Sequence, residues 1–101
     1  MRVELSDRAR LDLENIGEHY TDVGGHALAR RMIGGIKKEV LALAENPNIA
    51  PAYEMAPGLR RLVVAKGAFL VFYRVTSRVE VVHVRRAERE PYHAEEPAPW
   101  N

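Results

Sequence analysis

The hydrophobic spacing of this chain changes once, near residue 60, and that change restricts the fold more than any other feature of the sequence. Before it, apolar residues recur every three or four positions, which is the spacing of an amphipathic helix. After it, runs dense in valine and aromatic residues are typical of β-strands. Because the helices precede these strands and do not alternate with them, the sequence predicts an α+β domain and excludes a doubly wound sheet.

Two helices are expected in the first half. The first begins after Ser6, a favourable N-cap, and ends at Gly24-Gly25, where glycine permits a tight reversal. The second runs from about residue 26 to residue 45, because Asn46-Pro47 then stops it. Gly34-Gly35 lies inside this second helix, and we interpret the pair as a point of close helix–helix contact.

Short strands make up the rest of the predicted domain. Residues 3–5 are expected to form an edge strand, and residues 62–65, 69–75 and 79–84 a three-stranded antiparallel meander. The middle run AFLVFY is apolar on both faces, as in a strand buried on both sides or covered by a partner. Alternation places Val81, His83 and Arg85 on one face of the last strand. The predicted order is β-α-α-β-β-β, with a helical hairpin packed on one face of a small antiparallel sheet.

The length of 101 residues allows one compact core. We assign residues 1–90 to a single domain and residues 91–101, rich in proline and glutamate, to an extended or disordered tail. There is no cysteine, no apolar stretch long enough to span a bilayer and no signal-peptide pattern, so a cytoplasmic protein is expected.

Charge is distributed unevenly along the chain. Residues 1–59 carry 7 Lys/Arg and 9 Asp/Glu, residues 60–89 carry 8 and 2, and residues 90–101 carry 0 and 3. The basic third would attract phosphate groups or an acidic protein partner, although a solvated strand surface explains the same charges about as well.

Few residues suggest chemistry of their own. The histidines at positions 19, 26, 83 and 93 lack the paired spacing of a metal site, and no glycine-rich phosphate loop is present, so we expect neither a metal nor a nucleotide cofactor. His83 is interpreted as a residue packed at the sheet margin. Asp12 and Glu14 are interpreted as a solvated helix face.

Two segments resemble the RelE/ParE toxin superfamily. The opening LSDRARLDLENIGEHY resembles the first helix of these toxins, and PGLRRLVVAKGAFLVFYRVTSRVEVVHV is similar to the ParE pattern of strands. The resemblance spans residues 3 to about 90. It implies the toxin of a type II toxin–antitoxin pair, held in a hetero-oligomer by a ParD-like or RelB-like antitoxin. ParE-like toxins poison DNA gyrase, whereas RelE-like toxins cleave messenger RNA on the ribosome.

The sequence departs from both branches at single positions. ParE-like chains commonly carry an H-x-x-R pattern after the last strand; here Arg86 stands in the histidine place and Arg89 keeps the arginine. In the RelE-like interpretation Arg61, Arg86 and Tyr92 would be catalytic. However, Leu70 and Val63 stand where that pattern has basic residues, and fewer charges would stabilise the transition state.

The resemblance, taken with these departures, favours a non-enzymatic, ParE-like toxin that inhibits DNA gyrase and growth. The alternatives are a ribosome-dependent ribonuclease and an inactive module that binds only its antitoxin. Residues expected to bind the target share a basic side chain: Arg60, Arg61, Lys66, Arg86 and Arg89. Residues expected to bind the antitoxin share an apolar or aromatic side chain: Ile33, Ile36, Phe69, Val71 and Tyr73.

Overall fold

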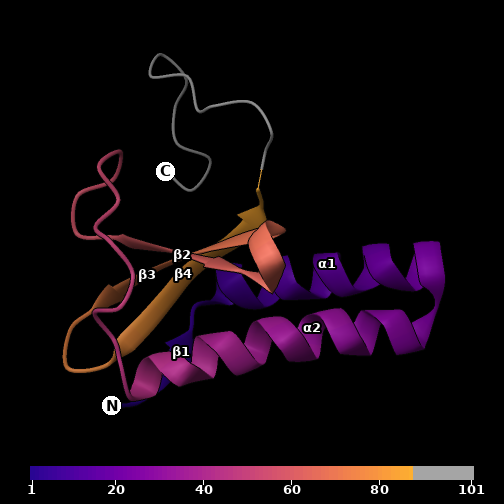
Figure 1. Cartoon of the computed structure of the whole chain (residues 1–101), viewed down its shortest axis with the longest axis horizontal. Helices are drawn as coiled ribbons and strands as arrows, with labels where there is room; N and C mark the ends of the chain where they lie inside the picture. Colours follow the sequence, from indigo (N-terminus) through magenta and orange to yellow (C-terminus); the bar gives the residue numbers. More distant parts are fainter. Residues whose placement is uncertain (88–101) are drawn as a thin grey trace.

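The computed structural model describes residues 1–87, and the predicted order of elements is confirmed. Two antiparallel helices lie side by side against a four-stranded sheet, and the far end of their hairpin projects beyond it (Figure 1). In chain order the elements are β1 (Val3–Leu5), α1 (Asp7–Gly24), α2 (His26–Leu41), the short 3₁₀ turn η1 (Ala42–Ala44), β2 (Arg60–Val64), the turn η2 (Ala65–Gly67), β3 (Phe69–Val75) and β4 (Val79–Arg86).

The first helix begins where the sequence places its cap. The Ser6 hydroxyl accepts a hydrogen bond from the Ala9 N–H at 3.0 Å, so one of the unpaired N–H groups of the first turn is satisfied. The same hydroxyl donates to the Val82 carbonyl at 2.9 Å. Ser6 therefore caps α1 and also fixes its start against β4. At the other end Gly25, with φ of +88°, makes the reversal into α2.

The interpretation of Gly34-Gly35 as a helix–helix contact is wrong. A Cβ atom built on either residue meets no other atom within 4 Å, so both glycines lie on the open side of α2. The glycine that faces the other helix is Gly17, whose added Cβ would lie 3.7 Å from the Ile33 side chain. Sequence spacing could not tell the two sides of α2 apart at this point, because glycine belongs to neither the apolar nor the polar pattern.

The sheet has the strand order β1-β4-β3-β2. We predicted an antiparallel sheet, but the observed sheet is mixed. The meander of β2, β3 and β4 is antiparallel as expected, but β1 pairs in parallel with the start of β4, with Val3 opposite Val79 and Leu5 opposite Val81. The two helices that follow β1 form an up-and-down hairpin before the meander, and the meander then brings β4 alongside β1 in the same direction.

A β-bulge in β4 changes which residues share a face. Tyr73 lies opposite Val81, but the preceding residue, Phe72, lies opposite His83, so Val82 is an extra residue in β4. Simple alternation predicted that Val81 and His83 share a face, and because of the bulge they do not. Instead Val81 and Val84 both point toward the helices, and His83 stacks on the Phe72 ring with centroids 6.0 Å apart.

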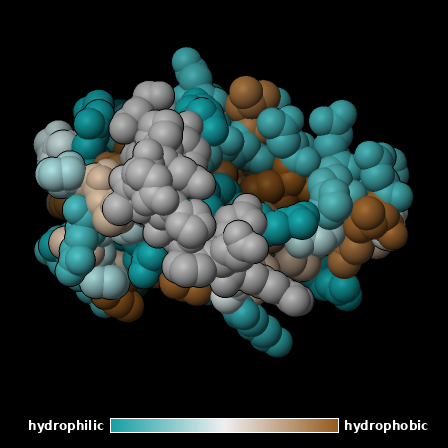
Figure 2. Space-filling view, turned by 90° about the horizontal axis from the view of Figure 1, so that it is seen from above, coloured by the Kyte–Doolittle hydropathy of each residue, from teal (hydrophilic) through white to brown (hydrophobic). Residues whose placement is uncertain are grey.

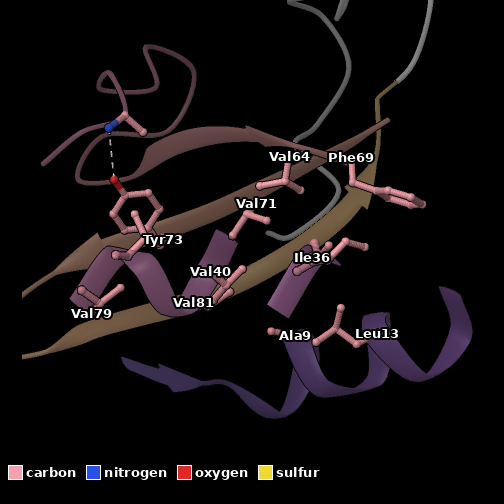
Figure 3. Packing of buried hydrophobic residues seen from close by; sticks show 13 residues of the cluster. Ala9, Leu13, Ile36, Val40, Val64, Phe69, Val71, Tyr73, Val79 and Val81 are labelled. Atoms are coloured by element: carbon pink, nitrogen blue, oxygen red, sulfur yellow. Dashed lines mark hydrogen bonds between the residues drawn. The ribbon is translucent and has the colours of Figure 1, made fainter. Parts of the chain in front are cut away.

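Buried side chains occupy both faces of β3. On the helix side Phe69, Val71 and Tyr73 pack with residues of α1 and α2, among them Ile36 and Leu13 (Figure 3). On the outer face, defined here as the face of the sheet away from the helices, Leu70 and Phe72 pack with Tyr53 and Leu59 of the loop that precedes β2. The chain's own helices thus cover one apolar face of the run AFLVFY, and its own loop covers the other.

The loop is tied to the sheet by hydrogen bonds that the sequence did not suggest. The Tyr73 hydroxyl donates to the Pro47 carbonyl at 2.7 Å and accepts from the Ala50 N–H at 3.4 Å. Burial raises the pKa of this hydroxyl, which keeps it protonated as a donor. Within residues 1–87 no helix is long and apolar enough to cross a membrane. The predicted tail, residues 91–101, lies outside the described residues.

Candidate functional site

Several arginines of the basic segment are already paired with carboxylates. Arg74 contacts Glu80 at 2.6 Å, and Arg78 contacts both Glu80 at 3.1 Å and Glu4 at 2.7 Å. Arg2 continues this row of charges by pairing with Glu4, and the neighbouring guanidinium groups lower the pKa of the Glu4 carboxyl. These side chains serve the junction of β1, β3 and β4, so the positive charge available to a partner must come from other residues.

Arg60, one of the predicted target-binding residues, is used inside the fold. Its guanidinium donates to the Ala50 carbonyl at 2.6 Å, with the Asn48 carbonyl at 3.5 Å. It lies opposite Tyr73 in the sheet, so both residues hold the same loop against the helix side. The structure thus gives Arg60 a structural role.

Arg61 and Arg85 lie on the outer face, each over an aromatic ring. The Arg61 guanidinium carbon is 5.4 Å from the centroid of Tyr53, and that of Arg85 is 5.7 Å from the centroid of Phe72. Such positions are favourable for a cation, and they hold the long side chains in place. The predicted site did not include Arg85. Because successive residues of a strand point to opposite faces, the sequence already showed that Arg85 and Arg86 lie on different faces.

Lys66 and Arg86 lie together at one end of the sheet, which we call the hairpin end. Lys66 is at the tip of the β2–β3 turn, and Arg86 lies opposite Phe69, the first residue of β3. The turn is unusual because Ala65 and Lys66 have φ of 53° and 55°, a region that side chains with a Cβ rarely adopt. The Glu39 carboxylate of α2 accepts from the Ala65 N–H at 2.8 Å and anchors the turn.

Arg86 also borders a shallow hollow of about 240 Å³ between the hairpin end and α1. Its other lining residues combine aromatic and polar groups: Asn15, Ile16, His19, Tyr20 and Phe69. Among residues 1–87, no carboxylate pairs with Lys66 or Arg86. The hairpin end therefore offers two unneutralised cations beside a partly aromatic surface.

The residues of the ribonuclease interpretation are not brought together. Arg61 points to the outer face, opposite Phe72, whereas Arg86 points to the helix side, opposite Phe69. The row across the outer face that contains Val63, Leu70 and Arg85 holds one cation where the ribonuclease pattern would place more. Tyr92, like Arg89 of the target-binding set, lies outside the described residues.

The predicted antitoxin-binding residues are mostly in the core. Ile36, Phe69, Val71 and Tyr73 are buried between the sheet and the chain's own helices, so the surface expected of them is not exposed. The prediction failed to foresee this because an apolar strand face looks the same in sequence whether a partner or the chain itself covers it. Phe69 also borders the hollow beside Arg86, and Ile33 lines a groove of about 370 Å³ along the open side of the helical hairpin with Ala29, Arg30 and Lys37.

A larger groove, which the sequence did not reveal, lies between β1 and the two helices. It has a volume of about 510 Å³, and we call it the β1–α2 groove. Its lining combines apolar and charged residues: Val3, Leu5, Leu13, Val40, Leu41 and Val84 are apolar, and Glu4, Arg10 and Lys37 are charged. Lys37 lies four residues after Ile33 and three before Val40, so it interrupts the apolar stripe of α2. This interruption was the one sign of the groove in the sequence.

His83 and Asp12 form a buried pair where α1 crosses β4. The His83 side chain is 4% exposed and its Nδ1 lies 2.6 Å from Asp12 Oδ2, which also accepts from the Val84 N–H at 2.9 Å. The position of His83 at the sheet margin is confirmed. The interpretation of Asp12 as part of a solvated face is wrong, because its side chain is only 11% exposed and bonds across to the sheet.

In the part of the chain that the structure describes, no group of three or more histidine, aspartate or glutamate side chains is placed to hold a metal ion. Figure 2 shows hydrophilic residues over most of the visible surface, with separate apolar residues among them.

Comparison with known proteins agrees on one family. The family model described as "ParE toxin of type II toxin-antitoxin system, parDE" matches residues 3–91. The chain is 33% identical over 81 residues to Toxin ParE1 of Caulobacter vibrioides, which covers 79% of this chain and 82% of that protein. A solved chain of the chromosomal ParDE system from P. aeruginosa superposes with a TM-score of 0.80 at 26% identity, over 87% of this chain and 97% of that chain. The isolated E. coli RelE toxin superposes with a TM-score of 0.63 at 18% identity, over 88% and 86% of the two chains, a likeness of fold alone.

Proposed function

Because this chain belongs to the ParE toxin family of type II toxin–antitoxin systems, we propose that it inhibits DNA gyrase without an enzymatic step of its own and is neutralised by a cognate antitoxin. The single observation that carries the non-enzymatic part is the separation of Arg61 and Arg86 onto opposite faces of the sheet. Phosphodiester cleavage of the RelE-like kind needs positive charge converging on one phosphate, and these two side chains diverge.

The hairpin end is the surface that we assign to the target. Lys66 and Arg86 are exposed there, and no carboxylate among residues 1–87 neutralises them. Two cations in front of a partly aromatic hollow suit an acidic protein surface, which would gain favourable pairing without displacing an internal ion pair. Arg89, which follows Arg86 by three residues in the sequence, stays in the proposed target-binding set.

The β1–α2 groove is the surface that we assign to the antitoxin. Its apolar lining can take the hydrophobic face of an amphipathic segment, and the exposed lining residues Arg10 and Lys37 would pair with acidic residues of that segment. Leu41 is 61% exposed beside the groove, so an apolar side chain is already available to a partner. The groove along the helical hairpin, which Ile33 lines, shares Lys37 with the β1–α2 groove. Together the two grooves would give the antitoxin a longer binding surface.

The target can be tested with purified chain in two parallel assays. In the first, gyrase converts relaxed plasmid to supercoiled plasmid with and without the chain; in the second, a cell-free translation reaction is scored for cuts in the translated messenger RNA. Inhibition of supercoiling with intact messenger RNA is the expected outcome. Cut messenger RNA with normal supercoiling would replace the proposal with the ribonuclease alternative, and no effect in either assay would leave a module that binds only its antitoxin.

A further inference from the structure

The outer face of the sheet holds two cations that the described chain does not neutralise. Arg61 and Arg85 lie over the rings of Tyr53 and Phe72, and no carboxylate of residues 1–87 is within ion-pair distance of either. The Nε of Arg85 is buried and has no hydrogen-bond partner among these residues. Two cations held on rigid aromatic supports lose little side-chain freedom when an anionic group binds.

Apolar surface lies beside these cations. Val63 is 53% exposed and lies opposite Leu70, which in turn lies opposite Arg85, so the three form one row across β2, β3 and β4. Met55, in the loop that covers part of this face, is 43% exposed. A ligand suited to this face therefore carries both carboxylates and apolar or aromatic side chains.

The chain itself leaves β4 at the edge of this face. Ala87 packs against the cluster of Tyr53, Leu70 and Phe72, and its N–H donates to the Ala68 carbonyl at 2.9 Å. The last described residue is thus held on the outer side of the sheet, and residue 88 begins there.

The sequence that follows matches the chemistry of the face. Residues 88–101 read EREPYHAEEPAPWN, with four glutamates against one arginine, three prolines and two aromatic residues, Tyr92 and Trp100. An extended segment of this length reaches about 40 Å at roughly 3 Å per residue. Three strand spacings of about 4.8 Å each give the width of the sheet, so the segment is long enough to cross it.

We propose that residues 88–101 bind in cis across the outer face, with glutamates paired to Arg61 and Arg85 and an aromatic side chain against Val63. This contact is separate from the target surface at the hairpin end, and its test does not depend on toxicity.

The absence of cysteine allows a single label to be placed on the segment. A nitroxide attached to Ala98→Cys in the full chain is expected to reduce the amide NMR signals of Arg61, Val63 and Leu70 by more than half, and to leave those of Gly34 and Gly35 on α2 unchanged. Raising the salt concentration should restore the lost signals, because the pairing is electrostatic and exposed. Loss of signal on the helix side, or equal intensities throughout, would overturn the proposal.

Two sets of variants identify the contacts. Arg61→Gln with Arg85→Gln should restore the signals of Val63 and Leu70, and so should Glu95→Gln with Glu96→Gln, which leaves residues 1–87 unaltered if the first pair disturbs folding. Arg30→Gln with Arg31→Gln removes the same charge from an exposed part of α2 and should restore nothing. If both outer-face and segment variants leave the broadening intact, the inference fails.

A mixing experiment separates the cis contact from contact between copies. Chain that carries the nitroxide but no isotope label is mixed with isotopically labelled chain that lacks the nitroxide. Only contacts between molecules can then broaden the observed signals. Unchanged spectra are expected. Broadening at Val63 and Leu70 in this mixture would show that the segment binds a second molecule, and it would replace the cis assignment.

Discussion

The carboxylate of Asp12 closes the edge of β4 where β1 has already ended. Its Oδ2 accepts from the Val84 N–H at 2.9 Å and contacts His83 Nδ1 at 2.6 Å, while Oδ1 pairs with Arg8 at 3.0 Å. A side chain of α1 thus takes the place of a neighbouring strand, and it satisfies a backbone donor that would otherwise be buried without a partner.

Replacing Asp12 should therefore be costly for stability. Asp12→Ala is expected to lower the free energy of unfolding by about 2–3 kcal/mol, because it leaves a buried N–H and a buried imidazole without their charged acceptor. Urea denaturation followed by circular dichroism measures the change. Glu14→Ala, on the exposed side of the same helix, is the matched control. Equal effects of the two substitutions would show that the contact with β4 does not matter for stability.

His83 gives stability a defined dependence on pH. Burial lowers its pKa below the ordinary 6.5; Asp12 opposes that shift, and Arg8 and Arg85 add to it. The unfolded chain therefore takes up a proton at a higher pH than the folded chain does. The contribution of His83 to the free energy of unfolding is therefore complete above pH 6.5. It decreases as the pH falls from 6.5 toward the lower pKa that His83 has in the folded chain.

The measurement is a set of urea midpoints at several pH values on both sides of 6.5, compared between the parent chain and His83→Gln. The variant should be less stable at high pH, and the part of the acid-side slope due to His83 should disappear. His26→Gln, which replaces an exposed histidine in the same way, is the matched control. A parent-like slope in His83→Gln would mean that other groups cause the pH dependence.

Among the elements, α2 carries a local defect that its packing does not explain. Gly34 and Gly35 lie in mid-helix on the open side, and an added Cβ at either would meet nothing within 4 Å. Gly34→Ala and Gly35→Ala should each raise the free energy of unfolding by about 0.5–1 kcal/mol, because alanine loses less backbone freedom on folding. Thermal unfolding measures the change. Gly25→Ala, at a φ of +88°, should instead destabilise the chain, and stabilisation there would contradict the described turn.

The elements themselves could be predicted because their signals are local. Helical spacing, the Ser6 cap and the Gly24-Gly25 reversal lie within a few residues of the structure they determine, and the predicted bounds differ from the observed ones by only a few residues. The bulge at Val82 lies between neighbouring strands, but the alternation along β4 does not mark the extra residue. The parallel pairing of β1 with β4 joins residues 76 positions apart, such as Val3 and Val79, and no local pattern encodes it. For the same reason the partner of Asp12 could not be foreseen.

The surfaces were harder to predict than the fold because a charge in the sequence does not show what neutralises it. Arg60 and Arg74 look as available as Arg86 does in the sequence, yet the first binds the Ala50 carbonyl and the second pairs with Glu80. Apolar residues present the same problem: Val71 is fully buried, whereas Leu41 lies beside a groove. Only the assembled molecule separates residues that hold the fold from residues that remain for partners.

At the scale of the whole molecule, the hairpin end and the β1–α2 groove are distinct surfaces, so toxicity and neutralisation should be separable. Arg86→Glu is expected to abolish growth inhibition while antitoxin binding stays within about twofold of the parent. Arg86 lies outside the β1–α2 groove, and a charge outside an interface contributes little to its affinity. Leu41→Glu should do the reverse: it places a carboxylate beside an apolar seat, and should weaken antitoxin binding at least tenfold, about 1.4 kcal/mol, while growth inhibition persists.

Growth of cells after induction, and calorimetric titration of each purified variant with the antitoxin, measure the two properties separately. Arg31→Glu reverses an exposed charge on α2 and should change neither. If Arg86→Glu lost both properties and its circular dichroism spectrum changed, misfolding would explain the result, and Arg86→Gln would repeat the test with less disturbance. Loss of both properties in a folded Arg86→Gln would mean that antitoxin and target share the hairpin end, and the assignment of two separate surfaces would be wrong.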